Sequence, residues 1–102
     1  MLLTQDQTMV RDAMREFVQS EITPHAARWD KEHHFPKDVH QGLAALGAYG
    51  ICVPEEYGGA GLDYLSLALV LEEIAAGDGG TSTAISVTNC PVNAILMRYG
   101  NA

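Results

Sequence analysis

The sequence predicts an all-α fold, a helical bundle formed by one domain that spans residues 1–102. Three observations predict it. Apolar residues recur at helical spacing near the N-terminus, residues 65–71 are apolar almost throughout, and residues 79–97 carry no charge but too many hydroxyl and amide groups for lipid. A chain of 102 residues is long enough to bury a hydrophobic core without disulfides or metals.

The composition is that of an acidic globular protein. Hydrophobic residues make up 47% of the chain and charged residues 19%, a balance that argues against disorder. The formal net charge of −7 argues against nucleic-acid binding, which needs clustered Lys and Arg. We therefore expect no nucleic-acid partner.

The cysteines and the apolar segments bear on the cellular compartment. Cys52 and Cys90 form no Cys-x-x-Cys motif and no disulfide framework, which predicts reduced thiols in the cytoplasm. No secretory signal is visible, and residues 65–71 are too short to span a bilayer. A cleaved mitochondrial leader would leave no trace, so the mitochondrial matrix stays open as the alternative.

The first predicted helix begins at a capping box. Thr4-Gln5-Asp6-Gln7 lets the Thr4 hydroxyl accept a first-turn N–H while Gln7 reaches back. Apolar residues then follow at helical spacing: Val10, Ala13, Met14, Phe17 and Val18. This amphipathic helix is expected to run to about Ile22, and Pro24 fits the first turn of a further helical piece, His25 to Lys31.

The middle of the chain contains breaks and one short helix. Phe35-Pro36 predicts a break, because the residue before proline avoids the helical region. A helix from Lys37 to Leu46 follows, with Gly47 at its C-terminal cap. Residues 48–53 are expected to be extended and buried, and the glycine-rich residues 54–61 to form a loop.

The next helix, Tyr64 to Ala76, has Asp63 as its N-cap and Gly77 as its stop. Between Leu65 and Leu71 only Ser66 is polar. A helix that is apolar on all sides is covered on all sides. We therefore expect a further domain or subunit to pack against this one.

The uncharged residues 79–97 contain the best candidate site. We expect two helices, about Thr81 to Asn89 and Pro91 to Arg98, with Pro91 opening the second. One helical face gathers small aliphatic and hydroxyl side chains: Thr83, Ala84, Val87, Thr88 and Pro91. Such a face suits an apolar ligand chain, but composition alone favours the alternative, a close helix–helix contact.

Other candidate sites are weaker. The loop Gly58-Gly59-Ala60-Gly61 lacks the spacing of a dinucleotide fingerprint or a P-loop, so a tight connection with positive φ angles is expected. No metal motif is present, and the four histidines are interpreted as solvated. Cys52 is expected to be buried and inert, and Glu72-Glu73 solvated or ion-paired, so no catalytic residue is assigned.

Several segments together resemble the acyl-CoA dehydrogenase family, over nearly the whole chain. They are Phe35-Pro36, Leu46-Gly47 with Gly50-Ile51, Val53-Pro54-Glu55-Glu56-Tyr57-Gly58-Gly59-Ala60-Gly61, Glu72-Glu73-Ile74-Ala75, and Tyr99-Gly100-Asn101. The Pro-Glu-Glu-Tyr-Gly-Gly loop followed by the Glu-Glu-Ile-Ala helix end is specific in combination. The resemblance implies that residues 1–102 are an N-terminal helical domain, ahead of a β-domain and a second helical domain that this sequence lacks.

The resemblance also implies a function. The full protein would use FAD, held mainly by the later domains and a neighbouring subunit, to oxidise an acyl-CoA to the 2,3-enoyl-CoA. A carboxylate of the C-terminal domain would remove the α-proton, the β-hydrogen would leave as hydride to the flavin, and an electron-transfer flavoprotein would accept the electrons. Neither the catalytic base nor the FAD-binding residues can be placed in this sequence.

For this chain, the resemblance implies that Thr83, Ala84, Val87, Thr88 and Pro91 line the acyl pocket, which reverses the preference for a plain packing face. It also implies a homo-oligomer, and a domain that is inactive and binds FAD poorly when alone. The alternative is a stand-alone helical interaction module derived from this fold. Some relatives of the family use flavin for other oxidations, so the reaction variant and the acyl chain length stay open.

Overall fold

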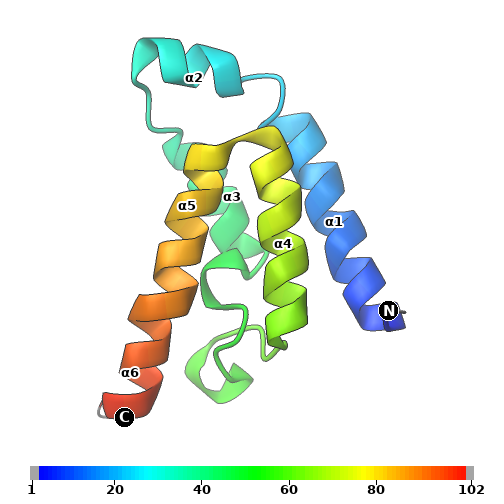
Figure 1. Cartoon of the computed structure of the whole chain (residues 1–102), viewed down its shortest axis with the longest axis vertical. Helices are drawn as coiled ribbons and strands as arrows, with labels where there is room; N and C mark the ends of the chain where they lie inside the picture. Colours follow the sequence, from blue (N-terminus) through cyan, green and yellow to red (C-terminus); the bar gives the residue numbers. More distant parts are fainter. Residues whose placement is uncertain (1–2, 101–102) are drawn as a thin grey trace.

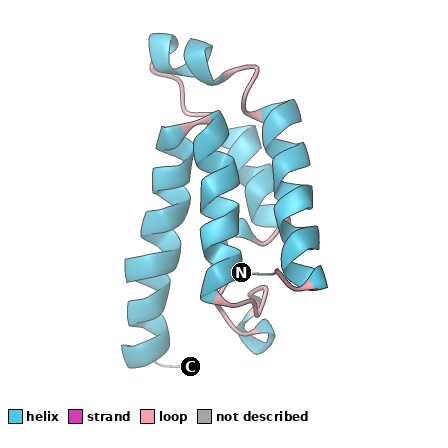
Figure 2. Ribbon diagram, turned by 45° about the vertical axis from the view of Figure 1, so that its right-hand side comes forward, coloured by secondary structure: helices cyan, strands magenta, loops and turns pink. Residues whose placement is uncertain are grey.

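The computed structural model describes residues 3–100, which form helices and turns with no strand among them (Figures 1 and 2). Asn101 of the Tyr99-Gly100-Asn101 segment lies outside the described residues. The longer elements are α1 (Gln5–Glu21), α2 (Ala26–Glu32), α3 (Lys37–Ala45), α4 (Tyr64–Gly77), α5 (Gly79–Val87) and α6 (Ala94–Tyr99). Short helical turns are η1 (Ala48–Gly50), η2 (Glu55–Tyr57) and η3 (Thr88–Asn93). The predicted all-α fold class is confirmed.

Local capping signals fix the starts of the two longest helices. In α1 the Gln7 amide N–H donates to Thr4 Oγ1 at 3.1 Å, and the Thr4 N–H donates to Gln7 Oε1 at 2.9 Å, so the capping box is confirmed. In α4 the Ser66 N–H donates to Asp63 Oδ1 at 2.8 Å, which confirms Asp63 as the N-cap. Both helices therefore begin where the sequence predicts.

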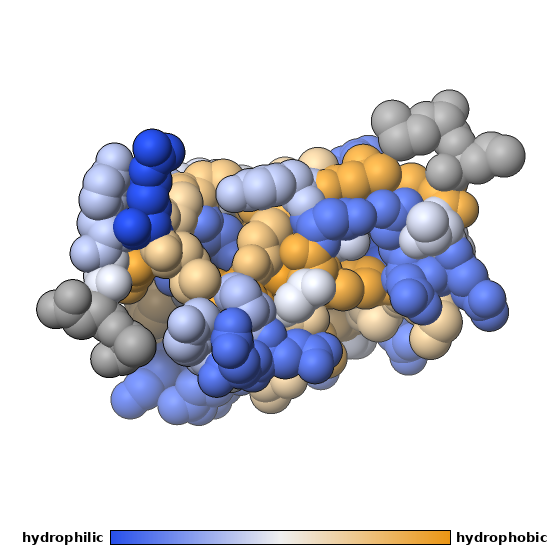
Figure 3. Space-filling model, turned by 90° about the horizontal axis from the view of Figure 1, so that it is seen from below, coloured by the Kyte–Doolittle hydropathy of each residue, from blue (hydrophilic) through white to orange (hydrophobic). Residues whose placement is uncertain are grey.

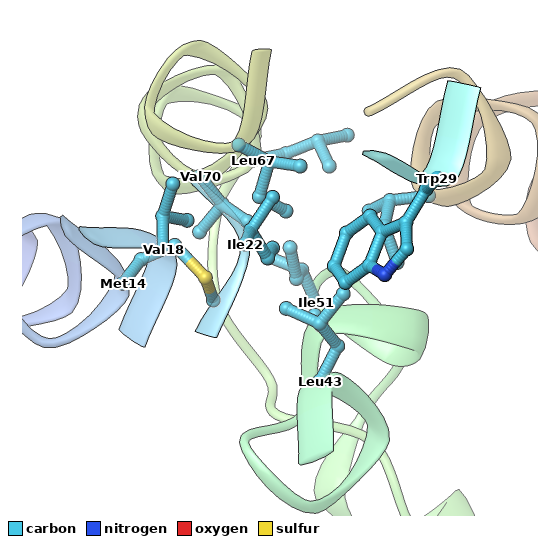
Figure 4. Close-up of a cluster of buried hydrophobic side chains, with 11 residues drawn as sticks. Met14, Val18, Ile22, Trp29, Leu43, Ile51, Leu67 and Val70 are labelled. Carbon is cyan, nitrogen blue, oxygen red and sulfur yellow. The ribbon is translucent and has the colours of Figure 1, made fainter. Parts of the chain in front are cut away.

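Helix α4 lies at the centre of the bundle, with α1 on one side and α5 on the other (Figure 1). Its side chains Leu67, Val70 and Ile74 are buried, and they meet Met14, Val18 and Ile22 of the N-terminal part (Figure 4). Leu43 of α3, Ile51, and Trp29 of α2 extend this core on another side (Figure 4).

This packing changes the explanation for the apolar α4. Leu65, Leu69 and Leu71 are half-buried and Leu67 and Val70 are buried within the domain itself. Helices α1 and α5 thus cover much of α4 within the domain, while the expected packing of a further domain or subunit stays a prediction. The longest run of exposed large apolar side chains lies along η3 and α6, at Val92, Ile95, Leu96, Met97 and Tyr99.

Apolar and hydrophilic side chains both reach the surface at the end of the bundle that holds the tip of α6 and the start of α1 (Figure 3). No residue of α6 is buried. A helix whose apolar residues are all exposed indicates a surface that is covered in another setting.

Residues 48–53 are not extended, so that prediction was wrong. Ala48–Gly50 is a 3-10 turn followed by further turns, although Ala48 and Ile51 are buried as expected. The reason is long-range: the Ala60 N–H donates to the Gly50 carbonyl at 2.9 Å, and the Leu62 N–H donates to the Ile51 carbonyl at 2.8 Å. The glycine loop thus satisfies the carbonyls that a strand would have used.

Pro91 does not open a new helix, which corrects a second prediction. The chain runs from α5 through the π-helical turn η3 into α6 as one rod (Figure 1), and Pro91 lies inside that turn. A proline within an α-helix removes a donor and its ring clashes with the carbonyl four residues earlier. A π-helical turn, with its wider i→i+5 spacing, accommodates this misfit without ending the helix.

Candidate functional site

The rod formed by α5, η3 and α6 has a buried side and an open side. Thr81, Ile85 and Asn89 recur every four residues and face the domain, with exposed fractions of 5% or less. The five predicted pocket residues lie elsewhere on the rod: Thr83, Val87 and Pro91 are exposed, and Ala84 and Thr88 are half-buried. The structure thus brings the predicted residues together on a face that the rest of the domain leaves accessible. We call these five residues the open face.

The hydroxyl groups of the open face are already used inside the helix. Thr83 Oγ1 donates to the Gly79 carbonyl at 3.0 Å, and Thr88 Oγ1 donates to the Ala84 carbonyl at 3.1 Å. Neither threonine therefore offers its hydroxyl hydrogen to a ligand without losing a bond. The other three residues of the open face, Ala84, Val87 and Pro91, have apolar side chains. The open face therefore behaves as an apolar surface.

Two polar residues hold the rod in place. Asp78 caps α5, since its Oδ2 accepts from the Thr81 N–H at 3.0 Å and from Thr81 Oγ1 at 2.6 Å. Farther along, the buried amide of Asn89 donates to the Ala48 carbonyl at 2.8 Å and accepts from the Ile51 N–H at 3.0 Å. No local pattern pointed to Asn89, because its partners lie about forty residues away along the chain.

A pocket of about 320 Å³ lies beside the N-terminal end of α5, and Ala84 belongs to its lining together with Phe35, His40 and Asp78. The His40 ring stacks on Phe35 with ring centroids 4.4 Å apart, and its Nδ1 shares a hydrogen bond with the Tyr49 hydroxyl. Burial lowers the pKa of His40, and Asp78 opposes that effect.

The interpretation of His40 as a solvated residue was therefore wrong, because the side chain is only 8% exposed. His33 and His34 are exposed as predicted, and His25 is half-buried. The available signal for His40 was its spacing of three residues from the buried Leu43 on α3.

The remaining candidates have structural roles. Gly58 and Gly61 have φ angles of 86° and 66°, which confirms the tight connection with positive φ. A Cβ at Gly59 would overlap the Val53 carbonyl oxygen. Cys52 is half-buried, and burial raises the pKa of its thiol, whereas Cys90 is exposed. Glu73 is ion-paired, since Arg15 Nη2 lies 2.7 Å from its Oε1.

Residues 3–100 hold neither a metal-binding cluster nor a membrane-spanning helix. No group of three or more His, Cys, Asp or Glu side chains there could hold a metal ion. Within the same range, no helix has both the length and the apolar character that crossing a bilayer requires.

Comparison with known proteins places this geometry in a family. The profile described as "Acyl-CoA dehydrogenase, N-terminal domain" matches residues 4–102. The short-chain specific acyl-CoA dehydrogenase of Rattus norvegicus mitochondria is 38% identical over 100 residues, which cover 98% of this chain and 24% of that protein.

Solved structures are similar to this chain in fold as well. A chain in the structure of the electron transferring flavoprotein of Acidaminococcus fermentans superposes with a TM-score of 0.93 at 35% identity, covering 98% of this chain and 26% of that one. Butyryl-CoA dehydrogenase from Megasphaera elsdenii gives a TM-score of 0.92 at 27% identity, covering 99% and 27%.

The chain thus spans about a quarter of the length of the relatives that it matches. The family match extends over nearly all of its residues, and the similarity in sequence is accompanied by similarity in fold. The chain therefore belongs to the acyl-CoA dehydrogenase family, as its N-terminal helical domain.

Proposed function

We propose that this chain is the N-terminal domain of a flavin-dependent enzyme that oxidises an acyl-CoA to the 2,3-enoyl-CoA, and that the open face lines the acyl pocket. The observation that carries the proposal is the exposure of Thr83, Val87 and Pro91 on a rod without any charged residue between positions 79 and 97. An acyl chain is apolar, and it is stabilised where a wall of small apolar groups removes it from water.

The domain would contribute binding and water exclusion, not proton transfer. The acidic side chains that cap or pair within the bundle are already engaged: Asp63 caps α4, and Glu73 pairs with Arg15. Asp78, which lines a pocket together with Ala84, caps α5 through two hydrogen bonds from Thr81. The base that removes the α-proton therefore belongs to another part of the full protein. The isolated domain is expected to be inactive.

The residues of this domain do not fit FAD by themselves. The glycine-rich loop 54–61 bonds to its own backbone, since the Gly58, Gly59 and Gly61 N–H groups donate to the carbonyls of Glu55, Pro54 and Val53. Glu55 and Glu56 add negative charge at the same loop, which repels a diphosphate. The cofactor would be held by the later domains of the full protein and a neighbouring subunit.

The partners of the full protein are part of the same proposal. The similarity to a chain from an electron transferring flavoprotein structure supports an electron-transfer flavoprotein as electron acceptor. The exposed apolar residues of η3 and α6 support burial against later domains within a homo-oligomer. The compartment of the full protein is proposed to be the cytoplasm or the mitochondrial matrix; the rat relative is mitochondrial.

The coding DNA beyond the Ala102 codon gives the first test. An open frame that continues into a β-rich segment and then a helical segment with a candidate glutamate supports the proposal. The complete polypeptide should then form 2,3-enoyl-CoA from saturated acyl-CoA with an artificial electron acceptor. A stop codon directly after Ala102, or a complete polypeptide that turns over no acyl-CoA, would overturn it.

The second candidate function is a stand-alone helical interaction module. The observation that favours it is the same exposed apolar surface, at Val92, Ile95, Leu96, Met97 and Tyr99, which a second copy would cover equally well. Multi-angle light scattering on the purified 102-residue chain separates the two candidates. A well-defined oligomer supports the module, whereas ill-defined association supports a domain severed from its enzyme. Stoichiometric flavin on the purified chain would contradict the first candidate's description of this domain.

A further inference from the structure

We infer that Asn89 is a positioning residue that sets the acyl-chain selectivity of the open face; this inference rests on the proposed function. Asn89 lies on the opposite, buried side of the rod from Val87, with an exposed fraction of 5%, so it cannot touch a ligand on that face. Its effect would be exerted through the backbone of the turn that carries Thr88 and Pro91.

The amide of Asn89 joins three separate backbone groups. Its Nδ2 donates to the Ala48 carbonyl at 2.8 Å and to the Ile85 carbonyl at 3.0 Å, and its Oδ1 accepts from the Ile51 N–H at 3.0 Å. Both amide hydrogens are therefore used, and two of the three bonds cross to the η1 region. No other side chain type of similar size offers two donors and an acceptor in this arrangement.

Asn93 repeats this link one turn later. Its Nδ2 donates to the Tyr49 carbonyl at 2.8 Å, so two amides of η3 hold three backbone groups within Ala48–Ile51: the carbonyls of Ala48 and Tyr49 and the N–H of Ile51. Beyond this point the rod has no buried residue, since α6 is exposed throughout. Within the described part of the rod, the two amides are the last fixed points before its open end.

The turn that Asn89 holds is the one that determines the geometry of the open face. Thr88–Asn93 is π-helical, with i→i+5 spacing, so residues after it are rotated relative to the positions that a continuous α-helix would give. The angle between Val87 and Pro91 on the open face therefore depends on this turn. Loss of the bonds to Ala48 and Ile51 would let the turn shift and widen the proposed pocket.

The test uses the complete polypeptide and compares kcat/KM for butyryl-, hexanoyl- and octanoyl-CoA. Asn89→Ser keeps a donor for the Ile85 carbonyl and loses the bonds to Ala48 and Ile51. Asn89→Asp keeps only an acceptor for the Ile51 N–H. For both variants we expect discrimination between the preferred chain and one two carbons longer to fall about tenfold, the effect of a changed pocket wall. Gln7→Ser is the matched control, because Gln7 is a buried amide on α1, remote from the open face.

A merely structural role would lower the amount of folded enzyme and leave the ratio between substrates unchanged. Unchanged ratios in folded Asn89 variants overturn the inference while leaving the proposed function intact. If neither Asn89 variant folds, Asn93→Ala decides: a smaller loss of discrimination supports the inference, and a wild-type ratio overturns it. A wild-type polypeptide inactive on every acyl-CoA overturns the proposed function and this inference with it.

Discussion

Gly77 lies against Val18 so closely that a Cβ at position 77 would fall 2.5 Å from Val18 Cγ1. The last turn of α4 thereby approaches the end of α1 with no side chain from position 77 between them. Alanine in a helix is favoured over glycine by about 1 kcal/mol, but overpacking in a close contact costs about 1–3 kcal/mol. Ile22 Cγ2 would lie 3.2 Å from the same Cβ, so the clash cannot be relieved on one side alone.

The first prediction is therefore that Gly77→Ala lowers the free energy of unfolding by up to about 2 kcal/mol and lowers the Tm by up to several degrees. Gly79→Ala is the control, because a Cβ at Gly79 meets nothing within 4 Å. That variant should be neutral or stabilised by about 0.5 kcal/mol. Thermal unfolding followed by circular dichroism measures both, and equal Tm values would contradict the contact.

The second prediction concerns the capping box of α1. Thr4→Ala removes the acceptor for the Gln7 N–H and should lower stability by about 1 kcal/mol. Thr4→Ser keeps the hydroxyl and should stay close to wild type. Urea unfolding of the three proteins gives the comparison, and a Thr4→Ala midpoint equal to that of wild type would show that α1 does not depend on its cap.

The fold could be predicted where the signal is local. Thr4 with Gln7, and Asp63 with Ser66, act within one helical turn, so sequence spacing alone predicted where α1 and α4 begin. The missed elements depend on distant partners. The turns at residues 48–53 exist because the N–H groups of Ala60 and Leu62 donate to carbonyls of this segment. The spacing of apolar residues in the sequence does not indicate these bonds.

The site shows the same division. Helical spacing predicted which residues share the open face, because i, i+4 and i+8 positions lie on one side of an α-helix. It could not predict that Thr81, Ile85 and Asn89 face the core, since both sides of the rod contain small uncharged residues. Nor could it find Asn89, whose bonds connect η3 with η1 only after the chain has folded.

The third prediction concerns pH. Burial holds the pKa of His40 below its ordinary value of 6.5, so the folded protein favours the neutral ring while the unfolded chain takes up a proton. The contribution of His40 to the free energy of unfolding is therefore fully retained above about pH 6.5, and it is lost as the pH falls toward the lower pKa of the folded state. His40→Gln should flatten this dependence, and the exposed His33→Gln should retain it. If His40→Gln left the dependence of stability on pH unchanged, another titratable group would be its cause.

The fourth prediction concerns thiol reactivity. Cys90 is exposed, whereas Cys52 is half-buried with a pKa that burial raises, and the thiolate is the reactive form. Ellman's reagent should therefore react in two phases near neutral pH, with Cys90 first. Cys90→Ser should remove the fast phase and Cys52→Ser the slow one. One phase of two equivalents would mean that both thiols are equally accessible.

The fifth prediction tests the open face itself. Val87 is 50% exposed within this domain, so Val87→Phe should change the stability of the isolated chain by no more than about 0.5 kcal/mol. In the complete polypeptide, the larger ring would occupy space proposed for the acyl chain. One methylene is worth about ten- to two-hundredfold in a hydrophobic pocket, so kcat/KM for octanoyl-CoA should fall at least about tenfold relative to butyryl-CoA. Met9→Phe, on the exposed side of α1, provides the matched control and should leave the ratio at the wild-type value. Because the isolated domain is expected to tolerate Val87→Phe, a changed ratio of kcat/KM between octanoyl-CoA and butyryl-CoA would come from the acyl pocket. An unchanged ratio would show that the open face does not line that pocket.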